Sequence, residues 1–421
     1  MLLYYKLEQD PVVTLIKRLQ GGSLNKEKKK RKRLCEEVFT KLLEKGEELG
    51  LSGNLWQGYL SYLLAIDENA WSLACERGEV SESLQKCALS DLSYIASLFF
   101  AELSVLCAHE PMAVMVTDYV NRKAGKTTNP VQKLAKNLKK AGKDSTGEQF
   151  AKALFSHYTS YGVGQFGLYQ AFRVRVSKRG KTKLVPIPET DEVRFSDLVG
   201  YEKQKEKLCQ NTEAFVNRRA ANNCLLFGPA GTGKSSSIKA LLTKYGDQGL
   251  RMIELYKHEL FALPGLLELV RGRNYRFIIF MDDLSFEDSE TDYKYLKAVI
   301  EGGLAKKPDN VLICATSNRR HLIRESFTDR EEGENDLHKN DTVQEKLSLA
   351  YRFGITIYFG SPNQKEFQQI VRALAERYKI GLPETELFLE ANRFELTHGG
   401  LSGRTAQAFI DYLRGTGRVQ G

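Results

Sequence analysis

The sequence predicts an α/β fold with a parallel sheet in its second half, preceded by a mainly helical N-terminal domain and followed by a small helical lid. Three observations lead to this prediction. Up to about residue 170, apolar residues recur at intervals of three and four, as they do along helices that bury one face. Beyond residue 190, short strand-like apolar runs alternate with helical stretches, which favours parallel strands joined by helical crossovers. From residue 361 onward the pattern is helical again.

Length and composition indicate how many domains to expect. At 421 residues the chain is too long for one ordinary domain, and its 42% of hydrophobic residues can fill several cores, which excludes wholesale disorder. We expect a mainly helical domain over 1–170, a basic hairpin and linker over 171–190, an α/β core over 191–360 and a helical lid over 361–421.

The cysteines and the apolar runs indicate a cytoplasmic protein. The seven cysteines include no CxxC pair and lie mostly in apolar runs, so we expect buried free thiols in a reducing compartment. The N-terminus lacks the long apolar core of a secretory signal. The longest apolar stretch, from Tyr94 to Ala108, is interrupted by Glu102 and is shorter than a bilayer-spanning helix, so we expect no transmembrane segment.

The first part of the chain is strongly basic. The formal net charge is +9, and three basic clusters precede residue 185: Lys26 to Arg33, Arg122 to Lys143 and Arg173 to Lys183. Clusters that share one face favour a polyanionic partner, whereas separate clusters are ordinary solvated surface. The middle cluster carries an apolar helical stripe, so it could lie on nucleic acid, an anionic membrane or an acidic protein, or pack on its own domain. The stripe consists of Val131, Leu134, Ala135 and Leu138.

The third basic cluster predicts a β-hairpin. Apolar residues alternate with basic ones from residue 171, a turn sequence follows at 177–181, and apolar residues return at 184–185. Pro186, Pro188 and the acidic residues 189–192 then break the pattern, as a short linker would.

Five apolar runs in the second half predict the strands of the sheet. They are Cys224 to Phe227, Arg251 to Leu255, Phe277 to Met281, Val311 to Ala315 and Ile355 to Phe359. Each is short, bounded by polar or turn residues, and separated from the next by a helical stretch.

The segment after the first strand matches the P-loop pattern, with a strand before it and a helix after it. Its glycines allow a tight turn that aims backbone N–H groups inward, and these groups hold phosphate oxygens together with the helix N-terminus. Lys234 would reach the β- and γ-phosphates of ATP, and the Ser235 hydroxyl would bind Mg²⁺. The expected ATP-binding residues of this loop are Gly228, Pro229, Ala230, Gly231, Thr232, Gly233, Lys234, Ser235 and Ser236.

Two carboxylates end a later strand, where a P-loop protein needs a metal partner. Asp282 and Asp283 follow the apolar run that ends at Met281. Asp282 would hold the hydrated metal, and Asp283 would orient or deprotonate the water that attacks the γ-phosphate. The alternative is that both side chains only cap the next segment.

With these motifs in place, residues 193 to 414 resemble the AAA+ superfamily of ATPases. Arg194 to Gly200 looks like the entry box of these proteins, which implies adenine contacts at Val199 and Gly200. Val311 to Asn318 looks like the strand that carries the first sensor, which implies that Asn318 bonds the phosphate or the attacking water. Alternatively, Asn318 caps the turn into Arg319.

Two arginines complete the resemblance. The segment around Arg352 is similar to the one that presents an arginine finger, which implies a homo-oligomer in which Arg352 reaches the γ-phosphate held by a neighbouring subunit. The alternatives are a surface arginine paired with Asp329 or Glu345, or Arg330 in the finger role. Arg404 looks like the second sensor on the lid, where it would couple lid closure to the nucleotide; a plain helix start capped by Ser402 is the competing explanation.

The whole chain also resembles an uncharacterised bacterial family of predicted AAA+ ATPases, a domain-of-unknown-function family, mainly through residues 228–235, 280–284 and 344–354. That resemblance implies ATP binding and names no substrate. Many AAA+ members have Asp-Glu where this chain has Asp282-Asp283, so we expect slow turnover.

The expected function is Mg²⁺-dependent ATP hydrolysis that remodels an unknown protein or nucleic-acid partner bound through the basic N-terminal domain. The alternative is a nucleotide-gated switch or loader with little intrinsic hydrolysis.

Overall fold

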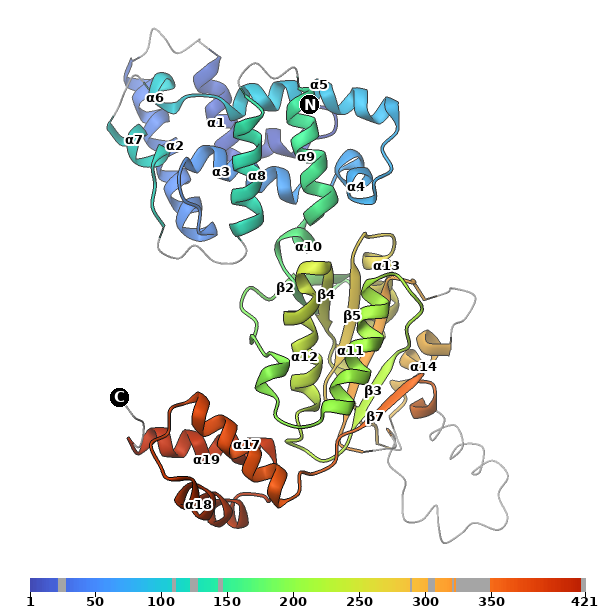
Figure 1. Ribbon diagram of the computed structural model, residues 1–421. Helices are drawn as coiled ribbons and strands as arrows, with labels where there is room; N and C mark the ends of the chain where they lie inside the picture. Colours follow the sequence, from blue (N-terminus) through green and yellow to red (C-terminus); the bar gives the residue numbers. More distant parts are fainter. Residues whose placement is uncertain are drawn as a thin grey trace. The chain divides into compact units, whose positions relative to one another are not determined.

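The computed structural model describes residues 1–21, 28–107, 111–121, 128–142, 147–287, 290–301, 307–319, 322 and 349–417. The chain forms two compact units, Met1–Tyr169 and Gln170–Gly421 (Figure 1).

The N-terminal unit is helical, as expected. Its elements are η1 (Tyr5–Gln9), α1 (Pro11–Gln20), α2 (Lys28–Leu49), α3 (Leu55–Ile66), α4 (Ala70–Arg77), α5 (Glu82–Phe99), α6 (Leu103–Leu106), α7 (Pro111–Thr117), α8 (Thr128–Lys140), α9 (Glu148–Tyr161) and α10 (Gln165–Leu168).

Large aromatic side chains fill the core of this unit. Trp56, Trp71, Phe39, Phe99 and Phe150 are all essentially inaccessible to solvent. These side chains contribute strongly to the burial of apolar surface, which is the main favourable term in folding.

The apolar stripe of α8 packs on its own unit. Val131, Leu134 and Leu138 are buried, and α8 lies against α3 and α9. Its lysines, including Lys136 and Lys139, remain exposed. The apolar stripe of α8 is therefore not a surface for a partner.

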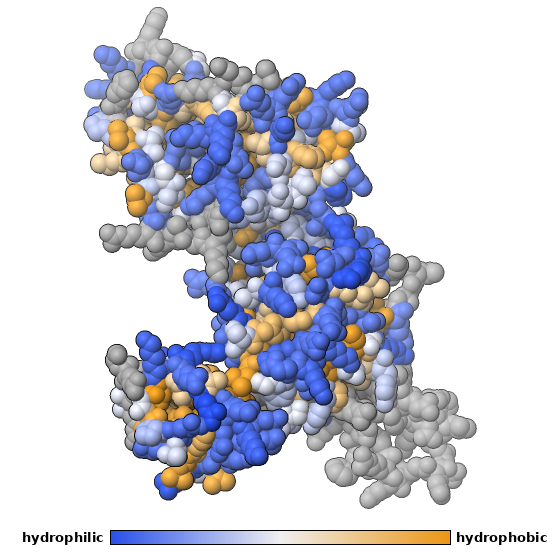
Figure 2. Space-filling view, viewed as in Figure 1, coloured by the Kyte–Doolittle hydropathy of each residue, from blue (hydrophilic) through white to orange (hydrophobic). Residues whose placement is uncertain are grey.

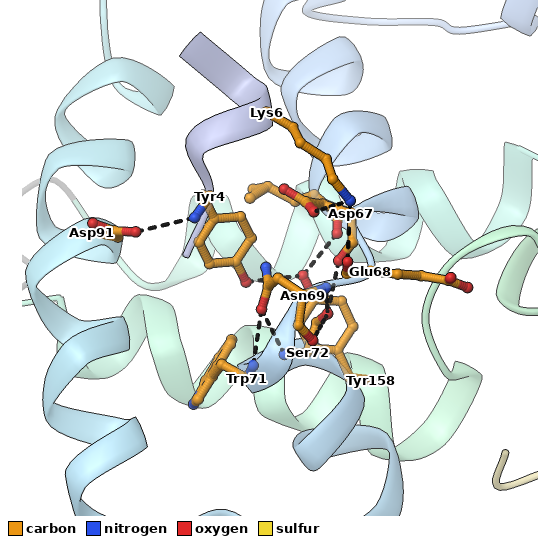
Figure 3. Close-up of polar contacts among 10 residues, drawn as sticks. Tyr4, Lys6, Asp67, Glu68, Asn69, Trp71, Ser72, Asp91 and Tyr158 are labelled. Atoms are coloured by element: carbon orange, nitrogen blue, oxygen red, sulfur yellow. Dashed lines mark hydrogen bonds and ion pairs between the residues drawn. The ribbon is translucent and has the colours of Figure 1, made fainter. Parts of the chain in front are cut away.

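A buried polar cluster lies where the N-terminus meets α4 and α9 (Figure 3). The Tyr158 hydroxyl donates to the Leu64 carbonyl at 2.7 Å and lies 3.3 Å from the Tyr4 hydroxyl. The Asn69 side chain caps α4, accepting from the backbone N–H groups of Trp71 and Ser72. Such caps satisfy amides that have no partner within the helix.

The second unit is built on a seven-stranded sheet in the order β2-β1-β4-β5-β6-β3-β7. Its strands are β1 (Ala171–Val176), β2 (Thr182–Pro186), β3 (Cys224–Phe227), β4 (Leu250–Glu254), β5 (Arg276–Met281), β6 (Val311–Ser317) and β7 (Ile355–Tyr358). Only the β1–β2 pair is antiparallel.

The basic hairpin expected between the two domains forms β1 and β2 and extends this sheet. β1 pairs in parallel with β4, with Ala171 opposite Met252 and Arg173 opposite Glu254. The Arg173 guanidinium also lies 3.0 Å from the Glu254 carboxylate. The hairpin is thus part of the α/β unit.

Helices join and cover the strands. They are η2 (Phe195–Asp197), α11 (Glu202–Val216), α12 (Lys234–Tyr245), η3 (Gly246–Gln248), η4 (Lys257–Ala262), α13 (Leu263–Val270) and α14 (Tyr293–Glu301). Three further helices, α17 (Gln364–Arg377), α18 (Glu384–Thr397) and α19 (Gly403–Gly415), form the lid. The lid has its own apolar core, which includes Phe367, Val371, Phe409 and Leu413.

The cysteines differ from expectation. Cys35 and Cys107 form a disulfide between α2 and the end of α6, so the prediction of free thiols is wrong for this pair. The two lie 72 residues apart, and only tertiary packing brings them together. Cys87 is a free thiol but is exposed. The cysteines therefore no longer support a reducing compartment. Among the described residues, no helix is both long and apolar enough to cross a membrane.

Candidate functional site

The P-loop joins the end of β3 to the start of α12 at Lys234. Gly228 has φ of 140°, and a Cβ atom there would overlap the carbonyl of Phe359. Gly231 has φ of 76°, and a Cβ atom there would lie 2.9 Å from the Ser402 hydroxyl. Both positions require glycine because the loop passes close to neighbouring backbone or side chains.

Lys234 is held inside the loop. Its ammonium donates to the carbonyls of Gly228 and Pro229, both at 2.7 Å, and to the Asn318 side-chain oxygen at 3.1 Å. Burial lowers the pKa of Lys234, and the nearby Asp283 and Asp282 oppose that shift. The lysine is therefore partly desolvated and held in place by the loop carbonyls and Asn318.

Asp282 accepts two hydrogen bonds on one oxygen. The hydroxyls of Ser235 and Thr316 both donate to its Oδ1 at 2.6 Å. Sheet order explains the meeting, because β6 lies between β3, which precedes the P-loop, and β5, which precedes the carboxylates. The carboxyl ends of parallel strands meet at one edge, where ligands of α/β folds bind.

Asp283 is positioned by β6 as well. Its backbone N–H donates to the Thr316 hydroxyl at 2.9 Å, and Asn318 donates its side-chain amide to the Asp283 carboxylate at 2.7 Å. Asp283 has φ of 50°, a left-handed conformation that is uncommon outside glycine. The turn after β6 is bonded by Ser317, whose hydroxyl accepts from the Arg319 N–H. Among the described residues, the Asn318 side chain bonds Lys234 and Asp283.

A cavity of about 610 Å³ lies over these groups, between the P-loop, the entry segment and the lid. The Gly403 N–H donates to the Gly231 carbonyl at 2.9 Å, which fixes the start of α19 over the loop. Arg377 of α17 pairs with Asp197 of the entry segment at 3.0 Å. The predicted residues that line the cavity are Val199, Ala230, Gly231, Thr232, Gly233, Lys234, Ser235, Ser236, Asp282, Asp283, Asn318 and Arg404.

Three predicted ATP-binding residues do not line this cavity. Gly228 and Pro229 instead supply the carbonyls that hold Lys234. Gly200 lines a neighbouring groove between the entry segment and helices α11 and α12.

The two arginines have different positions. Arg404 lines the cavity from the first turn of α19, and Ser402 caps that helix by accepting from the Thr405 N–H at 3.1 Å. Arg352 does not line the cavity; its guanidinium pairs with Glu301 of α14. The rival residues Asp329, Arg330 and Glu345 lie outside the described residues.

Sequence reasoning missed Thr316, whose hydroxyl bonds the Asp282 carboxylate and the Asp283 backbone N–H. The available signal was a polar residue inside an otherwise apolar strand, two positions before Asn318 and hence on the same face. It also missed Ile370, Leu374 and Arg377 of α17, which line the cavity from the lid.

The donor atoms of the site fit a magnesium ion held together with phosphate. The described residues include no group of three or more His, Cys, Asp or Glu side chains placed to hold a metal by themselves. One hydroxyl from Ser235 and one carboxylate from Asp282 are the sparse oxygen set that suits Mg²⁺ when substrate phosphates and water complete its shell.

A P-loop at the edge of a parallel sheet, a carboxylate strand close by and a helical lid above define an α/β P-loop protein of the AAA+ architecture. The N-terminal unit is a helical addition to it. The chain belongs to a family described as "Protein of unknown function (DUF815)", whose model matches residues 168–417.

Comparisons with individual proteins give only weak likenesses. No curated protein matches the chain. The Thermotoga maritima RuvB Holliday junction branch migration motor is 14% identical, with a TM-score of 0.32, over 52% of this chain and 72% of that one. The FIGL-1 AAA domain in complex with ADP is 18% identical, with a TM-score of 0.36, over 54% of this chain and 74% of that one. Likenesses at this level do not bear on what this chain does.

Proposed function

We propose that this chain binds ATP with Mg²⁺ in the cavity beneath the lid and hydrolyses it slowly, and that an oligomer of it remodels a partner macromolecule. The observation that carries the proposal is the convergence of Lys234, Ser235, Asp282, Asp283 and Asn318 on one cavity. Bound MgATP would supply the reactive phosphoryl group and the metal that neutralises its charge.

The side chains would divide the work between them. Lys234 and the loop amides bind phosphate oxygens, and Ser235 with Asp282 binds the metal and its water. Asp283 orients a water and takes its proton, while Asn318 holds the Asp283 carboxylate in place. Arg404 contacts phosphate from the lid, so that closure depends on the nucleotide.

Phosphate release from MgATP tests the proposal. Lys234→Ala and Asp282→Asn should each reduce turnover at least about a hundredfold, because each removes a charged contact to the triphosphate or its metal. Lys203→Ala is the matched control: it removes an exposed lysine of α11 that lines neither the cavity nor the neighbouring groove, and should leave turnover unchanged. Normal turnover in both site variants would refute the assignment.

The second candidate is a nucleotide-gated switch or loader with little hydrolysis. The Asp283 side chain is short, its carboxylate is held by Asn318, and its backbone is in a left-handed conformation. These features favour the switch, because a water would have to bridge the Asp283 carboxylate and the phosphate. Single-turnover phosphate release, measured with and without nucleic acid, separates the two functions. Tight ATP binding without release in either condition supports the switch; release supports the ATPase.

The cytoplasmic location and the homo-oligomeric state belong to the same proposal. ATP is an intracellular reagent, and an arginine finger that acts in trans requires a subunit interface.

A further inference from the structure

One surface of the N-terminal unit exposes a group of apolar side chains. Helix α7 has no charged residue, and it buries only Ala113 and Val116 against the unit. The exposed members of the group, here named the α6–α7 apolar patch, are Val105 (57% exposed), Met112 (41%), Val114 (65%) and Met115 (64%). Several large apolar side chains exposed on two successive short helices are unusual on a surface without a partner.

A run of six basic residues begins the neighbouring helix α2, from Lys28 to Arg33. All but Arg31 are exposed. The first turn of α2 contains no acid, although the helix dipole favours acids there and disfavours lysine and arginine. Such a departure from the local rule in the first turn is expected at functional or strained sites, so the run is a candidate binding element.

The patch and the basic run are adjacent. The Arg31 guanidinium donates to the Leu106 carbonyl at 2.9 Å, and the Cys35–Cys107 disulfide joins the same two segments. Helix α7 then packs along α2, and beyond it the Asn121 side chain donates to the Gly46 carbonyl near the other end of α2. Figure 1 shows α2, α6 and α7 side by side, and Figure 2 shows apolar side chains among hydrophilic ones on this part of the surface.

We propose that this surface docks the N-terminal unit on an anionic phospholipid bilayer. The apolar patch would enter the boundary between headgroups and acyl chains, while the basic run contacts lipid phosphates and carboxylates. The net charge of the surface supports this. Residues 28–37 and 101–117 contain four acids, Glu36, Glu37, Glu102 and Glu110, which only partly offset the six basic residues.

A bilayer fits both halves of the surface better than other polyanions do. Nucleic acid would use the basic run, but it would leave Val114 and Met115 in water, because these side chains have no group that bonds a phosphate or a base edge. A bilayer places a layer of negative charge directly over apolar chains, and so matches a basic and an apolar surface that lie side by side. The proposal is independent of nucleotide binding.

Sedimentation of the full-length chain with lipid vesicles tests it. We expect about tenfold or more stronger binding to vesicles containing phosphatidylserine than to phosphatidylcholine vesicles, and we expect high salt to reverse most of it. A Val114→Glu/Met115→Glu variant and a Lys28→Glu/Lys29→Glu variant should each lose most of this binding.

Matched controls carry similar substitutions elsewhere. Lys136→Glu/Lys139→Glu makes the same charge change on α8, whose apolar stripe is buried, and Leu396→Glu changes a lid side chain that is 79% exposed. Both should bind vesicles nearly as the unchanged chain does. Both tryptophans, Trp56 and Trp71, lie in the N-terminal unit, so tryptophan fluorescence shows whether each variant keeps that unit folded.

Three results would overturn the proposal. One is that the folded chain binds neither the anionic nor the neutral vesicles. This includes the case in which the chain instead binds an acidic peptide or nucleic acid through Lys28 and Lys29. Another is equal binding to neutral and anionic vesicles. The third is equal loss of binding in the α8 control and in the two surface variants.

Discussion

At the scale of single residues, Thr316 links the Asp282 carboxylate to the backbone of Asp283. Its hydroxyl donates its one proton to Asp282 and accepts from the Asp283 N–H, and the side chain is buried. One hydroxyl thus sets the direction of the carboxylate proposed to bind metal and supports the left-handed backbone of the next residue. Valine has the same shape but neither bond.

Thr316→Val should therefore slow ATP hydrolysis about 10- to 100-fold, because hydrogen bonds to charged groups contribute about 1.5–3 kcal/mol. Affinity for ATP should change only a few-fold, and the Mg²⁺ concentration needed for half-maximal rate should rise. Thr316→Ser keeps the hydroxyl and should recover most of the rate. The role fails if the valine variant shows an unchanged rate and Mg²⁺ dependence.

Asp67 is a second residue whose environment has a measurable consequence (Figure 3). Neither of its carboxylate oxygens has a hydrogen-bond partner among the described residues, and the Lys6 ammonium is 3.8 Å away. Burial raises the pKa of Asp67 to about 6, with Lys6 opposing the shift. Since the folded pKa exceeds the ordinary value of 3.8, the protonated form favours folding.

Asp67 should make the N-terminal unit less stable as the pH rises from about 4 to about 6, by about 1 to 2 kcal/mol. Asp67→Asn should remove this loss, so the variant gains on the unchanged chain across that window. Buried His157, whose pKa burial lowers to about 4, acts in the opposite direction, so only the difference between the two chains is diagnostic. Denaturant unfolding followed by tryptophan fluorescence measures it; a constant difference from pH 4 to pH 7 would contradict the assignment.

At the scale of elements, the lid is joined to the P-loop through the first turn of α19. The Ser402 hydroxyl caps that helix, the Gly403 N–H bonds the Gly231 carbonyl, and Arg404 lines the cavity. Residues 402–404 thus provide both the cap of α19 and the contacts of the lid with the P-loop and the cavity. Loosening the cap should move the side chain proposed to contact phosphate.

Ser402→Ala should cost about 1 kcal/mol of stability, as removal of a helix cap usually does, and should weaken ATP binding several-fold. Asn363→Ala is the control: Asn363 caps α17 by accepting from the Glu366 N–H, at a site that does not line the cavity. It should cost similar stability with little change in affinity. Calorimetric titration of ATP into both variants measures the two affinities. Equal affinities would show that the Ser402 cap does not influence ATP binding.

Elements defined by local signals were predictable from the sequence, and those that depend on distant partners were not. Strand β3 was predicted at Cys224 to Phe227 and has those bounds, because an apolar run between turn residues is a local pattern. The alternating pattern of residues 171–187 likewise predicted a hairpin. Its pairing with β4 was not predictable, because Ala171 and Met252 are brought together only by the sheet.

The same distinction holds for the site. The P-loop and Asp282 follow from motifs, because glycines and a strand-end carboxylate have a chemical requirement visible in sequence. Thr316 and the lid residue Arg377 needed three-dimensional information, since nothing local says which strand lies between β3 and β5 or which face of α17 meets the loop.

At the scale of the whole molecule, one chain does not complete the proposed catalytic set. Arg352 follows residues outside the described part of the chain, pairs with Glu301 of α14 and does not line the cavity of its own chain. An arginine that offsets charge at the γ-phosphate must come within hydrogen-bond distance of it. A role for Arg352 in catalysis therefore requires that it reach the site of another subunit.

Mixing two inactive variants tests whether Arg352 acts across an interface. In Arg352→Ala subunits the P-loop site is intact but the finger is absent, whereas Lys234→Ala subunits keep the finger. If each variant alone is at least about tenfold slower than the unchanged chain, mixed oligomers should recover activity at interfaces that join an intact site to an intact finger. Glu301→Gln, which removes the charge that pairs with Arg352 in one chain, should not impair activity. No recovery in oligomers verified to contain both variants would rule out action across the interface. An unchanged rate in Arg352→Ala alone would place Arg352 outside catalysis, and its pairing with Glu301 would then be its structural role.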